Sequence, residues 1–242
     1  MNVHIFDTAT QLNEAGAEMI KGILRMKPDA VLGLATGGTP TGIYAELVKA
    51  HRRGLIRFRK ATTFNLDEYV GLSPDHPQSY HYYMRHHLFA HIDLPPERVH
   101  IPDGTAPDPE AECRRYDRLL EQAGPIDLQI LGIGHNGHIG FNEPDDALHG
   151  GTHVVRLKTE TRKANARFFS SLDEVPTHAL TMGVGAILKA KSILLVACGP
   201  DKAEIVHRAL TGPITTQCPA SLLQTHPRVT VLLDAEAGRL FA

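Results

Sequence analysis

The segment Ala30–Pro40, AVLGLATGGTP, decides the fold class. Its first part, Ala30–Leu34, is a short apolar run that is typical of a buried strand. The second part is a glycine-rich turn that ends at Pro40, and proline is favoured in the first turn of a helix. A strand that passes through such a turn into a helix is half of a βα unit, and repeated βα units build a parallel sheet.

The same alternation of apolar runs and amphipathic stretches continues along the chain. The predicted strands are Ala30–Leu34, Thr62–Asn65, Leu128–Ile133, His153–Leu157, Ser192–Ala197 and Val229–Leu233. The predicted helices are Thr8–Met26, Thr41–Arg53, Ser79–Ala90, Asp108–Ala123, Ala179–Lys189 and Lys202–Leu210. No Ser/Gly-rich linker, charge block or internal repeat separates them. We therefore predict an α/β fold in which residues 1–242 form a single domain. Its sheet is doubly wound, mostly parallel and Rossmann-like, with helices on both faces.

The composition argues against several classes of partner. The chain has 242 residues, with 25 basic and 27 acidic side chains and a net charge of −2, so it has no overall field that would hold nucleic acid or an anionic membrane. Its apolar runs, such as Ile193–Cys198, are far shorter than the roughly 18 residues of a membrane span. The three cysteines show no C-x-x-C spacing, and the segment after Met1 lacks the pattern of a signal peptide. We therefore expect a cytoplasmic protein without nucleic-acid or membrane partners.

Ligands of doubly wound folds bind beyond the carboxyl ends of the strands. Four segments that follow predicted strands carry reactive side chains, and they are Ala35–Pro40, Asn65–Val70, Gly132–Glu143 and Gly199–Lys202. We expect all four to meet at one edge of the sheet.

Two of these segments are candidates for binding a phosphate. In Ala35–Pro40, main-chain N–H groups, the following helix dipole and the hydroxyls of Thr36 and Thr39 can all hold an anion. The segment is not a Walker A loop, because no Lys-Ser/Thr follows, and an ordinary tight turn remains an alternative. Lys202 opens a predicted helix, where a cation opposes the dipole unless an anion lies nearby. A solvated surface lysine is the alternative for Lys202.

Asp67 lies just after the predicted strand Thr62–Asn65. A carboxylate at the carboxyl end of a strand can serve as a general base toward a carbon acid next to a carbonyl or imine. The same residue could instead cap a short helical turn. Its position alone leaves both interpretations open.

The segment Gly132–Glu143, GIGHNGHIGFNE, is the densest in reactive residues. It contains a G-x-G-x-x-G pattern, but a dinucleotide fingerprint opens a helix, whereas Pro144 follows here. The histidines His135 and His138 stand in a glycine-rich loop without a zinc-binding pattern. We therefore expect neither a dinucleotide nor a metal, and we favour a histidine that moves protons and is oriented by Glu143.

Four motifs together resemble a known family. They are Thr36–Pro40, Phe64–Tyr69, Gly134–Pro144 and Thr161–Phe169, and they resemble the glucosamine/galactosamine-6-phosphate isomerase family, in particular its glucosamine-6-phosphate deaminases. The resemblance extends from near Ile5 to Leu233. It implies an enzyme that converts a small sugar phosphate, glucosamine 6-phosphate, with water to fructose 6-phosphate and ammonia. It also implies that no cofactor and no metal takes part.

The resemblance assigns a role to each matching residue. Asp67 matches the base that moves a proton from C2 to C1, and His138 matches the residue that carries protons between O1 and O5, with Asn136 and Glu143 as its partners. The residues that match the family's phosphate site are Thr36, Gly37, Gly38, Thr39, Arg167 and Lys202. The 6-phosphogluconolactonases are related sugar-phosphate hydrolases with the same fold, and they provide the alternative function. A non-catalytic regulator that binds a sugar phosphate is a third possibility.

Two departures from the family pattern concern regulation. The allosteric, hexameric members carry Asp where this chain has Asn136, and they bind the effector phosphate with basic residues after the Asn-Glu-Pro motif. Here Pro144–Val155 contains no Lys or Arg, and Asp145 and Asp146 would repel a phosphate. We therefore expect no activation by N-acetylglucosamine 6-phosphate, and a monomer or small homo-oligomer.

Overall fold

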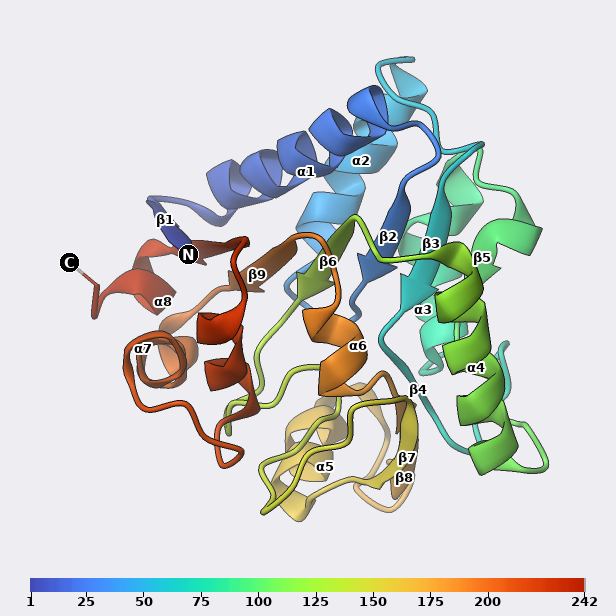
Figure 1. Ribbon diagram of the computed structural model, residues 1–242, viewed down its shortest axis with the longest axis vertical. Helices are drawn as coiled ribbons and strands as arrows, with labels where there is room; N and C mark the ends of the chain where they lie inside the picture. The colour runs from blue at the N-terminus through green and yellow to red at the C-terminus, as the bar shows by residue number, and fades with distance from the viewer. Residues whose placement is uncertain (242) are drawn as a thin grey trace.

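The computed structural model describes residues 1–241 and contains a central parallel sheet of seven strands in the order β1-β10-β9-β6-β2-β3-β5 (Figure 1). Its strands are β1 (Asn2–Phe6), β2 (Val31–Leu34), β3 (Thr62–Asn65), β5 (Val99–His100), β6 (Leu128–Leu131), β9 (Ile193–Ala197) and β10 (Val229–Asp234). Every residue of β2, β6 and β9 is buried, as expected for strands that helices cover on both faces. The predicted α/β class with a mostly parallel sheet is confirmed.

Helices α1 and α2 lie side by side along one face of the sheet, and α4, α6 and α7 lie on the other side (Figure 1). The helices are α1 (Ala9–Met26), α2 (Thr41–Arg52), α3 (Tyr80–His87), α4 (Pro109–Ala123), α5 (Thr159–Asn165), α6 (Val184–Leu188), α7 (Ala203–Thr211) and α8 (Ala235–Gly238). Short 3-10 turns are η1 (Phe89–His91), η2 (Pro96–Arg98), η3 (Ala166–Phe168), η4 (Pro200–Lys202) and η5 (Pro219–Thr225). Thr8, Ser79 and Asp108, which open three of the predicted helices, are N-caps whose side chains accept main-chain N–H bonds.

The strand order creates a ligand crevice. From β2 the chain passes outward to β3 and β5, and it then returns to β6 on the other side of β2. The connections that leave β2 and β6 therefore diverge, which is the switch point where ligands bind in doubly wound sheets. The turn Ala35–Pro40 follows β2 and the segment Gly132–Glu143 follows β6, so both stand at this point.

A second, antiparallel sheet packs beside the carboxyl edge of the first. It consists of β4 (Asp67–Tyr69), β8 (His178–Thr181) and β7 (His153–Arg156), with Asp67 opposite Thr181 (Figure 1). The predicted strand His153–Leu157 therefore forms, but its assignment to the parallel sheet is wrong. Its chain direction and its partner β8 place it in the small sheet.

The predicted helix Ala179–Lys189 is also wrong over its first part. Ala179 and Leu180 are good helix formers, yet they are fully buried in β8 between β4 and β7, and this tertiary pairing overrides their propensity. Only Val184–Leu188 is helical. The strand β1 was not predicted, because its side chains are mostly exposed at the sheet edge and show no buried face.

The main core lies between the parallel sheet and its helices, and a smaller apolar cluster lies under the second sheet. The smaller cluster is formed by Tyr69, Phe141, Leu157 and Ala179. Tyr69 and Phe141 stand next to the crevice, so this cluster supports the site described below. Within residues 1–241, no helix is both long and apolar enough to span a membrane.

Candidate active site

A cleft of about 750 Å³ opens at the carboxyl ends of β2 and β6. Residues of β4, α3 and α5, and of the turns before α2 and α7, also line this cleft. The predicted site residues that line it are Thr36, Gly37, Gly38, Thr39, Asp67, Asn136, His138, Arg167 and Lys202. Glu143 does not line the cleft and lies behind His138 instead. The structure thus brings the four predicted segments to one edge of the sheet.

Asp67 is the first residue of β4, and its carboxyl group is buried at the wall of the cleft. It is not an N-cap, because the residues that follow it form a strand rather than a helical turn. Burial, and then the like charge of Glu68, raise its pKa to about 8, with no hydrogen bond from the described residues to offset them. Asp67 therefore titrates close to neutral pH, and its ionised form is a stronger base than an ordinary aspartate.

His138 belongs to a hydrogen-bonded relay with Asn136 and Glu143. Asn136 Nδ2 donates to Glu143 Oε2 at 2.7 Å, because an ionised carboxylate can only accept. Asn136 Oδ1 therefore faces the other way and accepts from the main-chain N–H of His138 at 3.2 Å and from its Nδ1 at 2.7 Å. This arrangement places the imidazole hydrogen on Nδ1 and leaves Nε2 as the basic nitrogen.

Glu143 supplies the negative charge of the relay. Its Oε2 lies 3.5 Å from His138 Nδ1, while its Oε1 accepts from Thr161 Oγ1 at 2.5 Å. Burial acts to raise the pKa of Glu143, but hydrogen bonds from His138, Thr161 and Asn136 outweigh it and lower the pKa to about 2. A carboxylate that is always ionised stabilises an imidazolium, so His138 can take up a proton and release it again.

Two glycines shape the loop that carries His138 and Asn136. A Cβ at Gly134 would lie 2.1 Å from the ring of His138, so a side chain there would displace the imidazole. Gly137 has a φ of 89°, in the left-handed region, and a Cβ there would lie 2.6 Å from Cys218 Sγ. Gly134 thus leaves room for the His138 ring, and Gly137 allows the loop to pack closely against Cys218.

The turn Thr36–Thr39, the candidate phosphate turn, lines the same cleft as two cations, Arg167 and Lys202. Gly37 has a φ of 101°, which turns the chain directly before α2. Lys202 Nζ donates to the carbonyl of Ile133 at 2.9 Å, and Arg167 lies on η3. Burial lowers the pKa of Lys202, Asp201 opposes this, and the charge of Arg167 lowers it further. An anion between Arg167 and Lys202 would relieve both the burial cost and the repulsion.

The structure adds residues that the sequence did not single out. Thr161 holds Glu143 through its hydroxyl, and Tyr80 lines the cleft with its ring stacked on Phe141 at 6.2 Å. The signal for Thr161 was its place in the Thr161–Phe169 motif, and Tyr80 stood in an aromatic-rich helix without a distinguishing pattern. His135 pairs with Asp201 at 2.6 Å and not with His138. Within residues 1–241, no group of three or more His, Cys, Asp or Glu side chains is placed to hold a metal ion.

Comparison with known proteins identifies the family to which this chain belongs. Residues 6–232 match the model of a family described as glucosamine-6-phosphate isomerases/6-phosphogluconolactonase. The chain belongs to the glucosamine-6-phosphate isomerase/6-phosphogluconolactonase family. Among curated members of this family, a glucosamine-6-phosphate deaminase of Bacillus velezensis is 56% identical over 98% of this chain and 99% of that protein. Another, of Thermoanaerobacter pseudethanolicus, is 53% identical over 99% of this chain and 95% of that protein.

Solved structures of the glucosamine-6-phosphate isomerase/6-phosphogluconolactonase family give the same result. One, described as a monomeric glucosamine-6-phosphate deaminase, superimposes with a TM-score of 0.97 at 52% identity and covers 99% of this chain and 100% of its own. The 6-phosphogluconolactonase of Trypanosoma brucei superimposes with a TM-score of 0.77 at 22% identity, covering 100% of this chain and 98% of its own. The second likeness extends to the fold alone.

Proposed function

We propose that this protein is a glucosamine-6-phosphate deaminase, which converts glucosamine 6-phosphate and water to fructose 6-phosphate and ammonia. One observation carries the proposal. The buried base Asp67 opens into the same cleft as the His138 relay and the two cations Arg167 and Lys202. The reaction needs a carbon-acid base, a proton carrier and a phosphate site, and the cleft offers a residue for each.

The names of the relatives support the deaminase over the lactonase. Relatives that are 51–56% identical over nearly the whole chain carry the name glucosamine-6-phosphate deaminase. The solved lactonases are far more distant, at 17–24% identity. Hydrolysis of a lactone requires no base for a C2 proton, so a lactonase would leave Asp67 without this use.

In the first step of the proposed mechanism, the pyranose ring opens. His138 Nε2 accepts the proton of the O1 hydroxyl and delivers a proton to the ring oxygen O5, which gives the open-chain aldehyde. Glu143 stabilises the imidazolium that exists between the two transfers, and Asn136 keeps the imidazole hydrogen on Nδ1.

In the second step, Asp67 acts on the opened chain. The aldehyde makes the C2 proton acidic. The Asp67 carboxylate removes this proton while O1 takes up another, which gives an enolamine with a hydroxyl group on C1. The carboxyl group then returns the proton to C1, which leaves an imine at C2. Water adds to this imine, and its collapse releases ammonia and forms the ketone of fructose 6-phosphate. The phosphate site holds the chain while its other end reacts, and such binding of a non-reacting group contributes to the rate.

The test is an assay of ammonia and fructose 6-phosphate from glucosamine 6-phosphate, with 6-phosphogluconolactone as the competing substrate. We expect ammonia release with the amino sugar and no catalysed hydrolysis of the lactone. Lactone hydrolysis without ammonia release would assign the lactonase function instead. Binding of both phosphorylated compounds without turnover of either would indicate a regulator.

We also propose that the enzyme works in the cytoplasm as a single-domain monomer without nucleic-acid or membrane partners. Cys113, Cys198 and Cys218 are free thiols, which fits a reducing compartment. The relative with 52% identity is described as monomeric. Sedimentation or light scattering of the purified protein measures the oligomeric state directly.

A further inference from the structure

Helix α3 connects the two halves of the cleft. Its first two residues, Tyr80 and His81, bond to β4, the strand of the proposed base. Tyr83, about one turn further along the helix, bonds to the phosphate turn. Tyr80 also lines the cleft itself. The start of α3 therefore contacts both the strand of the proposed base and the turn proposed for phosphate binding.

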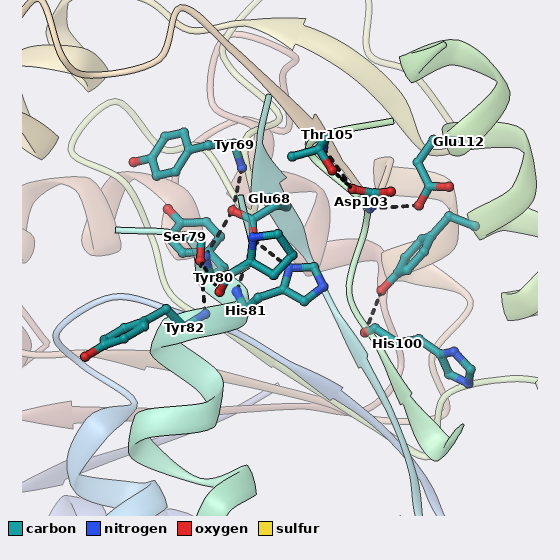
Figure 2. A network of polar contacts seen from close by, with 12 residues as sticks. Glu68, Tyr69, Ser79, Tyr80, His81, Tyr82, His100, Asp103, Thr105 and Glu112 are labelled. Atoms are coloured by element: carbon teal, nitrogen blue, oxygen red, sulfur yellow. Dashed lines mark hydrogen bonds and ion pairs between the residues drawn. The ribbon is translucent and has the colours of Figure 1, made fainter. Parts of the chain in front are cut away.

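The contact with β4 is made by Glu68, a fully buried carboxylate. Its Oε1 accepts the main-chain N–H groups of Tyr69 at 2.8 Å and Tyr80 at 3.0 Å. Its Oε2 accepts the main-chain N–H of His81 at 3.0 Å and His81 Nδ1 at 2.9 Å. Figure 2 shows the Glu68 carboxylate between the β4 main chain and the start of α3. Each bond to an ionised acceptor is of the strong, charge-assisted kind, so Glu68 fixes α3 to the strand of Asp67.

The contact with the phosphate turn is made by Tyr83. Its hydroxyl donates to the carbonyl of Gly37 at 2.6 Å. Gly37 has a φ of 101°, and without a side chain it has few conformational limits of its own. Because the peptide unit is planar and trans, holding the Gly37 carbonyl also fixes the direction of the N–H of Gly38, which lines the cleft.

We propose that Glu68 and Tyr83 are positioning residues that use α3 to hold the phosphate turn in a fixed place relative to Asp67. The inference rests on the proposed function, because it assumes that one ligand contacts both ends of the cleft. A substrate anchored through its phosphate presents C2 to the base only if that separation is constant, and small misplacements reduce the rate strongly.

The first test is Tyr83→Phe, which removes one hydroxyl and keeps the ring. We expect the Kd of inorganic phosphate and the KM of glucosamine 6-phosphate to rise about 3- to 10-fold, the range of one hydrogen bond, while kcat changes little. The matched control is Tyr116→Phe, since the Tyr116 hydroxyl is also buried and donates to carbonyls, those of Asn65 and His100. The control should lose stability without weakening phosphate binding.

The second test is Glu68→Gln, which keeps the size of the side chain and removes its charge. We expect kcat to fall about 10-fold through lost positioning. The acid limb of kcat/KM should move to lower pH, because the like charge next to Asp67 is gone. Its control is Glu112→Gln, a buried carboxylate that accepts from the main chain of Asp103 (Figure 2) and from Arg115. The control should be destabilised with an unchanged acid limb.

A measurement on the unmodified protein covers the case in which Glu68→Gln does not fold. Saturating inorganic phosphate should slow hydrogen exchange of the Tyr80 and His81 amides, which bond to Glu68, because α3 links them to the phosphate turn. Unchanged exchange at these amides, or phosphate affinity of Tyr83→Phe equal to that of the unmodified protein, would overturn the proposal. An acid limb that moves equally in Glu68→Gln and Glu112→Gln would reduce Glu68 to a structural role. Phosphate binding and hydrogen exchange need no turnover, so they remain decisive if the deaminase assay is negative.

Discussion

The two edges of the parallel sheet treat charged side chains in opposite ways. At the amino edge, the Asp127 carboxylate accepts from Lys27 Nζ and Lys191 Nζ, each at 2.7 Å, and from the main-chain N–H of Val31 at 2.8 Å. Although burial opposes them, these bonds hold the pKa of Asp127 below its usual value. At the carboxyl edge, Asp67 has no such donors among residues 1–241, and its pKa is raised to about 8.

The pKa values of the lysines at the two edges also shift in opposite directions. Hydrogen bonding to Asp127 raises the pKa of Lys27, whereas burial lowers the pKa of Lys202 in the cleft. The Asp127 charge at the amino edge is thus satisfied by bonds within the protein, whereas burial dominates the pKa shifts of Asp67 and Lys202 in the cleft. Residues whose pKa is shifted by burial, in a protein whose other buried carboxylates are paired, therefore mark the candidate reactive site. Five predictions test it, in order of decreasing effect.

Asp67→Asn removes the base while its amide keeps the shape of the carboxylate. We expect kcat to fall by about 10²- to 10⁴-fold, the usual contribution of a general base, with little change in substrate binding. Exchange of the C2 proton with deuterated solvent, followed by NMR, should disappear together with turnover. Near-normal exchange in the variant would assign the base to another residue.

Lys202→Ala and Arg167→Ala test the cations of the cleft. Each should weaken the binding of fructose 6-phosphate by roughly 1.5–3 kcal/mol, the scale of hydrogen bonds to charged groups. Calorimetric titration gives the affinities, and unphosphorylated glucosamine serves as the control ligand. Equal losses for both ligands would point to misfolding rather than to a phosphate contact.

The raised pKa of Asp67 has a consequence for stability. Folded protein keeps the Asp67 proton up to about pH 8, whereas the unfolded chain loses it near 3.8. Between these values the folded state binds the additional proton, so this group makes stability fall as pH rises. Asp67→Asn has no proton to lose at this position, so its stability relative to the unmodified protein should increase from pH 4 to pH 8, by at most about 1.4 kcal/mol for each pH unit. Urea denaturation across this range measures the difference, and a constant difference would contradict the raised pKa.

Asp127→Asn should give the opposite sign at the other edge. The lowered pKa of Asp127 stabilises the folded state above pH 3.8, and this contribution is lost as pH falls through the folded-state pKa. We expect a loss of about 1 kcal/mol at pH 7, modest because both lysines are partly exposed, with kcat unchanged. Thermal melts at pH 7 and pH 3 provide the measurement. A loss that does not shrink at low pH would argue against the ion pairs as its cause.

The last prediction is that N-acetylglucosamine 6-phosphate has no effect on the kinetics. The two cations that line the cleft, Arg167 and Lys202, are proposed to bind the substrate phosphate, and Pro144–Val155 provides no Lys or Arg for an effector phosphate. A ligand without differential affinity shifts no equilibrium. Initial rates should therefore remain hyperbolic in substrate with and without N-acetylglucosamine 6-phosphate. Sigmoidal rates that become hyperbolic on adding it would require an effector site built from other residues.

Sequence patterns predicted the central sheet well, because its strands are short apolar runs that end in glycine-rich turns. The strands β2, β3, β6, β9 and β10 all fall on predicted segments. The small sheet was not predicted, since β4 has only three residues and β8 has the composition of a helix. Both strands form because they pair with segments far away in the sequence, and local propensity does not predict such pairing.

The proposed site was predicted at the level of residues but not of contacts. Loop position and family motifs indicated Asp67, His138 and Glu143. In the structure, Asp67 and His138 line one cleft, and Glu143 contacts His138 from behind. The roles of these residues, and the single-domain organisation, stay predictions. Among residues 1–241, no side chain donates a hydrogen bond to Asp67, whereas Glu68 accepts four. Both facts depend on side-chain geometry, which residue spacing in the sequence does not predict. Asp67 and Glu68 are adjacent carboxylates of β4, and the sequence does not distinguish their different surroundings.

The pairing of β4 with β8 also bears on how the protein is made. β2 and β3 are close in sequence and can pair early, whereas Asp67 meets its partner Thr181 only after most of the chain has left the ribosome. Pairings between distant segments carry a larger loop-closure cost and form late in folding. We therefore expect nascent chains to build much of their scaffold before the base is placed. A chain truncated before β8 would be an inactive intermediate with an exposed strand edge, the kind of species that chaperones protect.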